Sequence, residues 1–332
     1  MEKRRFLSGL SAVVLAAGLL AGCGAQPAGE EALSGSGGAS SAQTISQDKS
    51  TAEWETVVFT DSLGREVRLE TEPEAVAVML GSYADVWQLA GGTVAATTQD
   101  AWDQEIGLPQ ETVNVGSHQE PDLEALLAAE PDFVILTPDI EGQLGLQETL
   151  EAAQIPAAYF HVDSFEEYLH MLEICTQITG RDDLYQENGA ALQEQIEQTI
   201  DSVQGKQAPR VLLMRAYSSG VKAKNSDNFV GAMLNDLGAV NIADSDASLL
   251  EDLQMESIVA ADPDVILITT MGDEQKALDN LSATLQADPA WSALRAVENG
   301  DVNVLQKDLF HYKPNARWAE SYETLATILY DA

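Results

Sequence analysis

The chain has 332 residues and is strongly acidic, with 54 Asp and Glu against 17 Lys and Arg and a formal net charge of −37 at pH 7. Such a surface repels nucleic acid, because binding to phosphates needs clustered Lys and Arg. Two cysteines are too few for a cysteine-based zinc site or a framework of several disulfides. The acidic excess therefore indicates a solvated surface and excludes nucleic acid as a partner.

The N-terminal segment has the pattern of an export signal that ends at a cysteine. Basic residues 3–5 precede an apolar run over residues 6–20, which is too short to span a bilayer. The following Leu20-Ala21-Gly22-Cys23 resembles a lipobox, which implies diacylation of Cys23 and cleavage before it. An uncleaved anchor, or an ordinary signal with a chance cysteine, is the alternative. We expect residues 1–22 to be a lipoprotein signal peptide and the protein to be lipid-anchored at the outer face of the cell membrane.

A low-complexity segment separates this signal from the rest of the chain. Residues 23–54 are rich in Gly, Ser, Ala and Gln and have little to bury, so we expect a flexible tether. The remaining residues exceed what one core usually holds. We predict an N-terminal α/β lobe at residues 55–180, an interlobe helix at residues 181–205 and a C-terminal α/β lobe at residues 206–332.

An internal repeat supports the division into two lobes. Leu-Glu-Ala-Leu-Leu-Ala-Ala-Glu-Pro-Asp-Phe-Val-Ile-Leu at residues 123–136 matches Met-Glu-Ser-Ile-Val-Ala-Ala-Asp-Pro-Asp-Val-Ile-Leu-Ile at residues 255–268, an offset of 132. Each copy predicts a short helix, a break at Pro-Asp and a wholly apolar strand. Continuous apolar strands that alternate with helices are typical of parallel sheets covered on both faces.

The other predicted elements follow the same plan in chain order. A hairpin is expected where residues 57–59 and 65–69 flank Asp61-Ser62-Leu63-Gly64. In the first lobe we expect strands near residues 75–79, 93–97, 133–136 and 157–160, and helices near residues 83–90, 143–153 and 165–178. In the second lobe we expect strands near residues 210–215, 265–269 and 301–305, and a last helix at residues 315–329.

Residues 182–203 carry apolar side chains at helical spacing between the lobes. Asp182 can cap this helix and Gly205 can end it. Its length is about 30 Å at 1.5 Å per residue, close to the diameter of a domain. We expect a single helical connector that limits how far the lobes can swing.

These features together resemble the ferric-siderophore and cobalamin class of substrate-binding proteins of ABC importers. The resemblance rests on the lipoprotein leader, the tether, the twin helix and Pro-Asp-strand units and the long helix between two lobes. It also rests on Asp61-Ser62-Leu63-Gly64-Arg65, on residues 81–91 and on Tyr312-Lys313-Pro314-Asn315-Ala316-Arg317-Trp318. It implies two Rossmann-like lobes joined by one long helix, with a ligand cleft between them.

The resemblance assigns a docking role to one glutamate on each lobe. The matching residues, Glu124 and Glu256, would meet arginines of the permease. The same spot in both repeats suits a partner with two-fold symmetry. The alternative is that each glutamate only complements the positive end of its helix, worth a few tenths of a kcal/mol.

The ligand is expected outside the carboxyl ends of the strands, where open α/β sheets bind ligands. The loops there hold the candidate ligand-binding residues Ser82, Tyr83, His118, Arg215, Tyr217, His311, Tyr312 and Arg317. The family resemblance independently places Ser82, Tyr83 and His118 at the rim of the cleft.

The basic residues are unevenly distributed. Residues 1–22 hold three of the 17, and of the remaining 14 seven lie on the second lobe near two of these loops: Arg210, Arg215, Lys222, Lys224, Lys307, Lys313 and Arg317. This distribution favours an anionic ligand, with Arg matching oxygen acceptors. Ordinary surface pairing with Asp and Glu is the alternative for each lysine. Ferric siderophores are often anionic, so the cluster favours an iron chelate over cobalamin.

Histidines and tryptophans leave further alternatives open. His118 and His311 fall on opposite lobes near the cleft, and a tyrosine could join them on haem iron. Against this, the four histidines form no close pair, and lone histidines are more often surface or core residues than ligands. Trp87 and Trp318 could pack on a chelator, but both lie in helices, where core packing is the default.

No motif of hydrolases, phosphate-binding loops, dinucleotide-binding folds or zinc proteases occurs, so we expect no enzyme. We predict a monomeric lipoprotein, without a cofactor, that captures a ferric siderophore and delivers it to an ABC permease dimer with its ATPase. Haem or cobalamin as cargo, and a lipoprotein that only sequesters or senses its ligand, remain the alternatives.

Overall fold

The structure, a computed structural model, describes residues 54–251 and 253–330. The predicted signal peptide, the lipidation site Cys23 and nearly all of the predicted tether lie outside the described residues. Within the described ranges, no helix is both long and apolar enough to cross a membrane.

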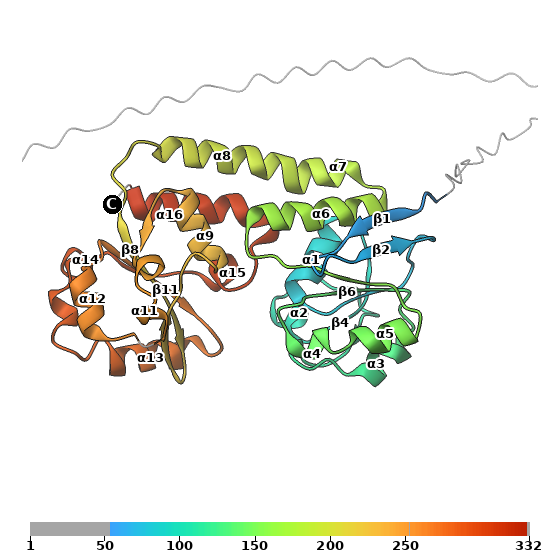
Figure 1. The fold of residues 1–332 in the computed structure, drawn as a ribbon, viewed down its shortest axis with the longest axis horizontal. Helices are drawn as coiled ribbons and strands as arrows, with labels where there is room; N and C mark the ends of the chain where they lie inside the picture. The colour runs from blue at the N-terminus through green and yellow to red at the C-terminus, as the bar shows by residue number, and fades with distance from the viewer. Residues whose placement is uncertain (1–53, 252, 331–332) are drawn as a thin grey trace, which may run out of the picture. The chain divides into compact units, whose positions relative to one another are not determined.

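A parallel sheet forms the centre of the first lobe (Figure 1). Its strand order is β5-β4-β3-β6-β7, and the predicted hairpin β1 and β2 packs beside it. The strands are β1 (Val57–Thr60), β2 (Glu66–Leu69), β3 (Val76–Val78), β4 (Val94–Thr97), β5 (Val113–Asn114), β6 (Phe133–Leu136) and β7 (Ala157–Tyr159). The helices are α1 (Gly81–Leu89), α2 (Asp100–Asp103), α3 (Leu123–Ala128), α4 (Glu141–Leu144), α5 (Gln147–Ala152) and α6 (Phe165–Thr179). The predicted helix at residues 143–153 is thus two short helices.

The second lobe repeats this plan. Its parallel strands have the order β10-β8-β11-β12, and β9 pairs antiparallel with β8. The strands are β8 (Arg210–Tyr217), β9 (Gly220–Ala223), β10 (Val240–Asn241), β11 (Val265–Thr270) and β12 (Val302–Val304). The helices are α9 (Phe229–Asp236), α10 (Ile242–Ser245), α11 (Ser248–Glu251), α12 (Met255–Ala261), α13 (Glu274–Thr284), the 3₁₀ turn η2 (Trp291–Ala293), α14 (Arg295–Asn299) and α15 (Lys307–Phe310). Two α/β units with buried parallel strands confirm the predicted fold class.

The repeated segment forms the same structure in both lobes, as predicted. Helix α3 leads to β6, and α12 leads to β11. The residue before each proline, Glu130 or Asp262, has a positive φ, 49° and 41°. Since proline disfavours a helical conformation in the residue before it, each helix ends there and the chain turns into the strand.

The aspartate of each Pro-Asp pair holds the neighbouring strand in place. The carboxylate of Asp132 accepts hydrogen bonds from the amides of Glu74 and Ala75 at 2.7 and 3.0 Å, just before β3. The carboxylate of Asp264 accepts one from the Arg210 amide at 2.8 Å, at the start of β8. The repeat therefore fixes the register of the two central strand pairs, β3 with β6 and β8 with β11.

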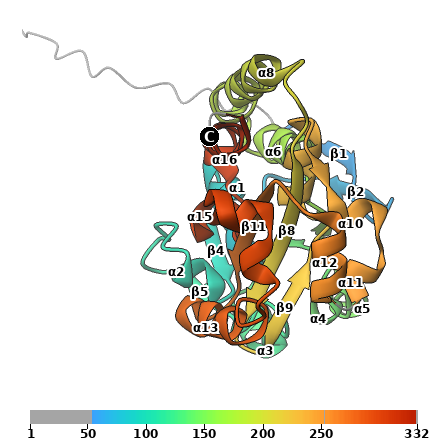
Figure 2. The ribbon, with the colours of Figure 1, turned by 90° about the vertical axis from the view of Figure 1, so that its left-hand side faces the viewer.

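The connector between the lobes is helical but not a single α-helix. It consists of α7 (Asp182–Tyr185), the π-helical turn η1 (Gln186–Ala190) and α8 (Ala191–Val203). After the 3₁₀ turn η3 (Asn315–Arg317), the C-terminal helix α16 (Trp318–Tyr330) packs along α8. Figure 2 shows α8 and α16 above the strands β8 and β11. The connector is therefore one part of a helical layer rather than an isolated strut.

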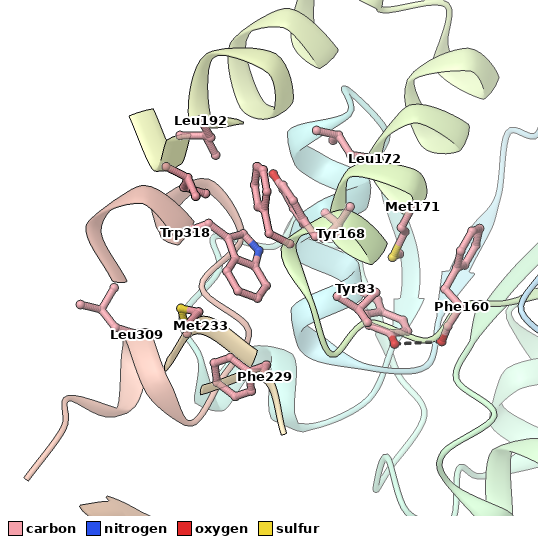
Figure 3. Close-up of a cluster of buried hydrophobic side chains, with 14 of the residues drawn as sticks. Tyr83, Phe160, Tyr168, Met171, Leu172, Leu192, Phe229, Met233, Leu309 and Trp318 are labelled. Atoms are coloured by element: carbon pink, nitrogen blue, oxygen red, sulfur yellow. Dashed lines mark hydrogen bonds between the residues drawn. The ribbon is translucent and has the colours of Figure 1, made fainter. Parts of the chain in front are cut away.

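One hydrophobic core runs through this helical layer and into both sheets. The fully buried indole of Trp318 lies at its centre, with ring centroids 5.8 Å from Phe165, 6.2 Å from Tyr168 and 6.0 Å from Phe229 (Figure 3). Phe165 and Tyr168 lie on α6 of the first lobe, and Phe229 lies on α9 of the second. Trp318 is therefore a core residue shared by both lobes, in agreement with the default expectation for a helical tryptophan.

Buried polar contacts join the lobes next to this core. Asn315 is 2 % exposed and has a φ of 49°, and its Nδ2 donates to the Ser82 carbonyl and to Asp85 Oδ2, both at 2.8 Å. Burial raises the pKa of Asp85, and the hydrogen bond from Asn315 partly offsets this. Lys313 forms an ion pair with Asp163. The segment before α16 thus attaches the second lobe to α1 of the first.

The side chain of Gln143 forms hydrogen bonds with three loops of the first lobe. Its side chain is fully buried, and Nε2 donates to the carbonyls of Met79 at 2.6 Å and His118 at 2.9 Å. Its Oε1 accepts from the amide of Thr137 at 3.0 Å. These loops follow β3, β5 and β6, so one amide group sets the spacing of three loops at the carboxyl edge of the sheet.

We expect Gln143→Leu to destabilise the protein by at least about 3 kcal/mol, because each buried backbone group left without a partner costs about 1–3 kcal/mol. Denaturant unfolding followed by tryptophan fluorescence measures this change. Gln193→Leu is the matched control, since the exposed Gln193 amide bonds only Glu197, at 2.9 Å. An equal, small effect of both substitutions would contradict the role given to Gln143.

Candidate functional site

The carboxyl edges of the two sheets contain the functional groups that the sequence singled out. In each sheet, the side on which successive strands are added switches at the central pair, which is β3 and β6 in the first lobe and β8 and β11 in the second. The connections at such a switch point diverge to opposite sides, which leaves room for a ligand outside the strand ends. The loops that follow these strands therefore define the candidate site.

On the first lobe, Asp100 organises the loops after β3, β4 and β5. Its carboxylate accepts hydrogen bonds from the Gly81 amide at 2.7 Å and the Thr98 hydroxyl at 2.6 Å, and it lies 3.5 Å from Nδ1 of His118. Burial would raise the pKa of Asp100, but the hydrogen bonds from His118, Thr98 and Gly81 lower it below its ordinary value. The hydrogen bond to Asp100 in turn raises the pKa of the half-buried His118.

His161, which follows β7, carries a second group of charges on the same lobe. Its Nδ1 lies 2.8 and 2.9 Å from the two carboxylate oxygens of Asp139. Its Nε2 lies 3.8 Å from Asp163 and 3.7 Å from Glu167. Partial burial lowers the pKa of His161, but the hydrogen bond to Asp139 and the nearby carboxylates outweigh it and raise that pKa. His161 was not among the candidate ligand residues, because its neighbours along the chain do not reveal Asp139.

On the second lobe, basic side chains gather without acidic partners. Arg215 and Lys222 face each other as direct neighbours on β8 and β9, and Lys224 follows β9. Within the described part of the chain, none of the three forms an ion pair with a carboxylate. Among the described residues, the Arg215 guanidinium donates to the Thr269 hydroxyl alone, at 3.4 Å. Burial, together with Arg215 and Lys222, lowers the pKa of Lys224.

His311 and Lys307 extend this basic cluster. Burial and the neighbouring Arg215 and Lys307 lower the pKa of His311 to about 4, so its imidazole is neutral at pH 7. Its Nδ1 is buried and has no hydrogen-bond partner among the described residues. Tyr312 lies against it, with ring centroids 4.9 Å apart. We call Arg215, Lys222, Lys224, Lys307 and His311 the basic cluster.

Groups of the two lobes influence each other across this region. Burial raises the pKa of Tyr312 on the second lobe, and Asp103 and Asp100 of the first lobe add to the effect. Asp163 of the first lobe likewise acts on Lys224 of the second. Carboxylates of the first lobe are thus near enough to groups of the second lobe to shift their pKa values.

Tyr217 lies beside the basic cluster rather than within it. It lines a pocket of about 290 Å³ together with Lys222 and the apolar side chains of Leu249, Leu250 and Leu253. The pocket wall is both polar and apolar, since Ser219, Lys222 and Glu251 line it beside the three leucines.

Three predicted ligand residues have other roles in the structure. Tyr83 is 2 % exposed and its hydroxyl donates to the Phe160 carbonyl at 2.9 Å, so it is a core residue (Figure 3). Ser82 is buried, and its carbonyl accepts from Asn315. The exposed Arg317, at the end of η3, pairs with Glu320 in the first turn of α16, 2.7 Å away. The roles of these three residues differ from the prediction because helical spacing and packing between the lobes set their contacts. A position in a predicted loop reveals neither.

Two more of the seven basic residues that the sequence places near the candidate loops, Arg210 and Lys313, lie outside the basic cluster. Arg210 is at the amino end of β8 and bonds the Ala261 carbonyl at 3.0 and 3.2 Å, far along the strand from Arg215. Lys313 forms an ion pair with Asp163, and its Nζ lies 4.8 Å from the centroid of the Phe229 ring. The unpaired cations are therefore fewer and more concentrated than the sequence indicated.

Across residues 54–251 and 253–330, no three His, Cys, Asp or Glu side chains are arranged to hold a metal ion. Cys175 is fully buried, and burial raises the pKa of its thiol.

Comparisons with known proteins agree with this architecture. The chain is 23% identical over 251 residues to the Fe(3+)-citrate-binding protein YfmC of Bacillus subtilis, which covers 71% of this chain and 74% of that protein. Its fold is similar to Staphylococcus aureus SirA complexed with staphyloferrin B, with a TM-score of 0.64, 16% identity and coverage of 83% and 98% of the two chains. It is equally similar to S. aureus IsdE complexed with heme, with a TM-score of 0.64, 14% identity and coverage of 77% and 98%.

A family model described as periplasmic binding protein matches residues 76–309, which include both central sheets and the helical connector. Proteins of this family are extracytoplasmic carriers of substrates and not enzymes. The chain belongs to the periplasmic binding protein family.

Proposed function

We propose that this protein captures an anionic ferric chelate between its two lobes and delivers it to the permease of an ABC importer. The family membership and the iron-binding relative support transport of an iron complex. The basic cluster supports an anionic cargo. Modest closure of the lobes, limited by the helical layer, accompanies capture.

The observation that carries this proposal is the set of unpaired cations on the second lobe. In a chain with 54 acidic and 17 basic residues, a cation easily finds a carboxylate. Arg215 and Lys222 nevertheless lie directly opposite each other on paired strands, where like charges are destabilising. An anionic ligand offsets this repulsion, because charge-assisted hydrogen bonds to its oxygens replace the missing carboxylates.

One observation favours haem as a second candidate cargo. His311 is neutral, its ring lies against that of Tyr312, and its buried Nδ1 has no hydrogen-bond partner among the described residues. Neutral imidazole and tyrosine oxygen are both axial ligands of haem iron. Titrations with ferric citrate, other ferric chelates, haem and cobalamin separate the candidates.

The permease is proposed to dock on Glu124 and Glu256. Both side chains are exposed, both lie in the first turn of a repeat helix, and neither has an ion-pair partner among the described residues. Two equivalent carboxylates, one on each lobe, suit two equivalent subunits of a permease dimer. We further propose that Cys23 carries the lipid that holds this monomeric receptor near the permease and its ATPase.

The basic cluster can be tested by substitution. We expect Arg215→Gln and Lys224→Gln each to weaken the binding of ferric citrate by about tenfold, since hydrogen bonds to charged groups contribute about 1.5–3 kcal/mol. Tryptophan fluorescence titration measures the affinity. Lys276→Gln, which removes a lysine paired with Asp273 on the same lobe, is the control and should bind normally. Unchanged affinity in both cluster variants would refute the assignment.

The titration of His311 reports directly on an anion in the site. In the free protein its pKa is about 4, because burial and the nearby Arg215 and Lys307 disfavour the charged imidazolium. Bound negative charge offsets these cations, so we expect the pKa to rise toward its ordinary value of about 6.5. NMR titration with and without gallium citrate, a diamagnetic substitute for the ferric complex, measures the shift. A pKa that stays near 4 at saturation would argue against an anion beside His311.

Docking can be tested by charge reversal. We expect the double variant Glu124→Lys, Glu256→Lys to abolish uptake of radioactive iron by cells while ligand affinity stays unchanged. Glu148→Lys and Glu298→Lys are controls, because both glutamates are exposed on other helices. Loss of ligand affinity in the double variant would contradict a docking role.

A further inference from the structure

The two repeat helices expose the same large apolar position. Leu127 on α3 is 37 % exposed and Val259 on α12 is 44 % exposed, and the two residues are 132 positions apart, as are the repeats. The next residues, Ala128 and Ala260, are also exposed. The exposed apolar side chain is thus a property of the repeat and occurs once on each lobe.

Packing within the lobes does not account for this exposure. The residues that precede them, Leu126 and Ile258, are fully buried and already fill the core beneath each helix. In a helix, residues three apart lie on the same face. Leu127 therefore lies beside Glu124, and Val259 lies beside Glu256, so each helix presents a carboxylate and an apolar group together on its outer face.

The other large apolar side chains that are exposed in the described residues lack this relation. They are Val58, Leu63, Val113, Leu144, Val240, Met271 and Val304. No two of these seven are related by the repeat offset. Val113, Val240 and Val304 belong to the outermost strands of the two sheets, where one face of the strand is open to solvent. Among the large apolar side chains exposed in the described residues, Leu127 and Val259 are thus the one pair related by the repeat offset.

We propose that Leu127 and Val259 are equivalent apolar contacts for the permease dimer, each inserted beside the ion pair of its neighbouring glutamate. Each permease subunit would offer an apolar hollow next to a cation. The inference rests on the proposed function and adds to it the apolar half of the docking surface. A second copy of this chain is a poor occupant, because the net charge of −37 makes two copies repel each other.

The apolar contact also explains how docking can be strong at physiological salt. An exposed ion pair contributes little to affinity and is screened by salt. An apolar side chain that enters a pocket excludes water from the adjacent ion pair, and buried apolar anchors surrounded by polar groups dominate the affinity of many interfaces. The glutamates then set the orientation and the apolar residues supply affinity.

The test uses the full chain with its permease and ATPase in lipid nanodiscs. We expect Leu127→Gln and Val259→Gln each to weaken docking by about tenfold and the double variant by about a hundredfold, because each removes one buried apolar anchor. Ferric citrate affinity and the thermal midpoint should stay unchanged. Leu144→Gln is the matched control, since Leu144 is 39 % exposed on α4 outside the repeat.

The outcomes distinguish this inference from the proposed function. If the double variant docks within about twofold of the parent while Glu124→Lys, Glu256→Lys abolishes docking, the apolar contact is wrong and the docking role stands. If neither double variant affects docking, the docking face itself is wrong. A parent that sediments as a dimer, with a monomeric Leu127→Gln, Val259→Gln variant, would overturn the inference in favour of self-association.

Discussion

The burial of Trp318 among aromatic rings from both lobes is the constraint on which the rest of the structure depends. Its indole contacts rings on α6 and α9, and the same cluster continues along α8 and α16. Buried aromatic side chains bring large apolar areas and prefer specific edge-to-face geometries, so such a cluster resists sliding. Together with the bonds from Asn315 to α1, it keeps the carboxyl edges of the two sheets near one another while the loops beyond them remain free to bind a ligand.

The site that results has two electrostatically different sides. On the first lobe, carboxylates surround two histidines and raise the pKa of both. On the second lobe, burial and the neighbouring cations lower the pKa of a lysine and a histidine. Burial is the largest cause of these two decreases and the cations add to it, whereas on the first lobe the carboxylates together outweigh burial.

Most of the fold was predictable from local patterns. The predicted bounds of strand β6 are correct at both ends, because this strand is wholly apolar. The helix predicted at residues 165–178 differs from α6 by one residue, because α6 is long. The short strands β5, β9 and β10 were missed, since β5 and β10 have two residues each and β9 has a single buried residue, so none shows an apolar pattern. The helix break at Gly145 and the π-helical turn in the connector were also missed, because each lies within a segment whose sequence predicts one continuous helix. Of the candidate site residues, Arg215 and His311 lie in the basic cluster, whereas Tyr83 is in the core.

The sequence by itself determined the two α/β lobes, the helical connection and the duplicated helix with its Pro-Asp break, because apolar periodicity and proline act within a few residues of where they occur. Only the tertiary structure decided which charged groups are free. Lys313 pairs with Asp163 of the other lobe, while Arg215 and Lys224 pair with no carboxylate of the described residues. Pairing between the lobes depends on distances between residues far apart in the chain, and no local pattern encodes those distances.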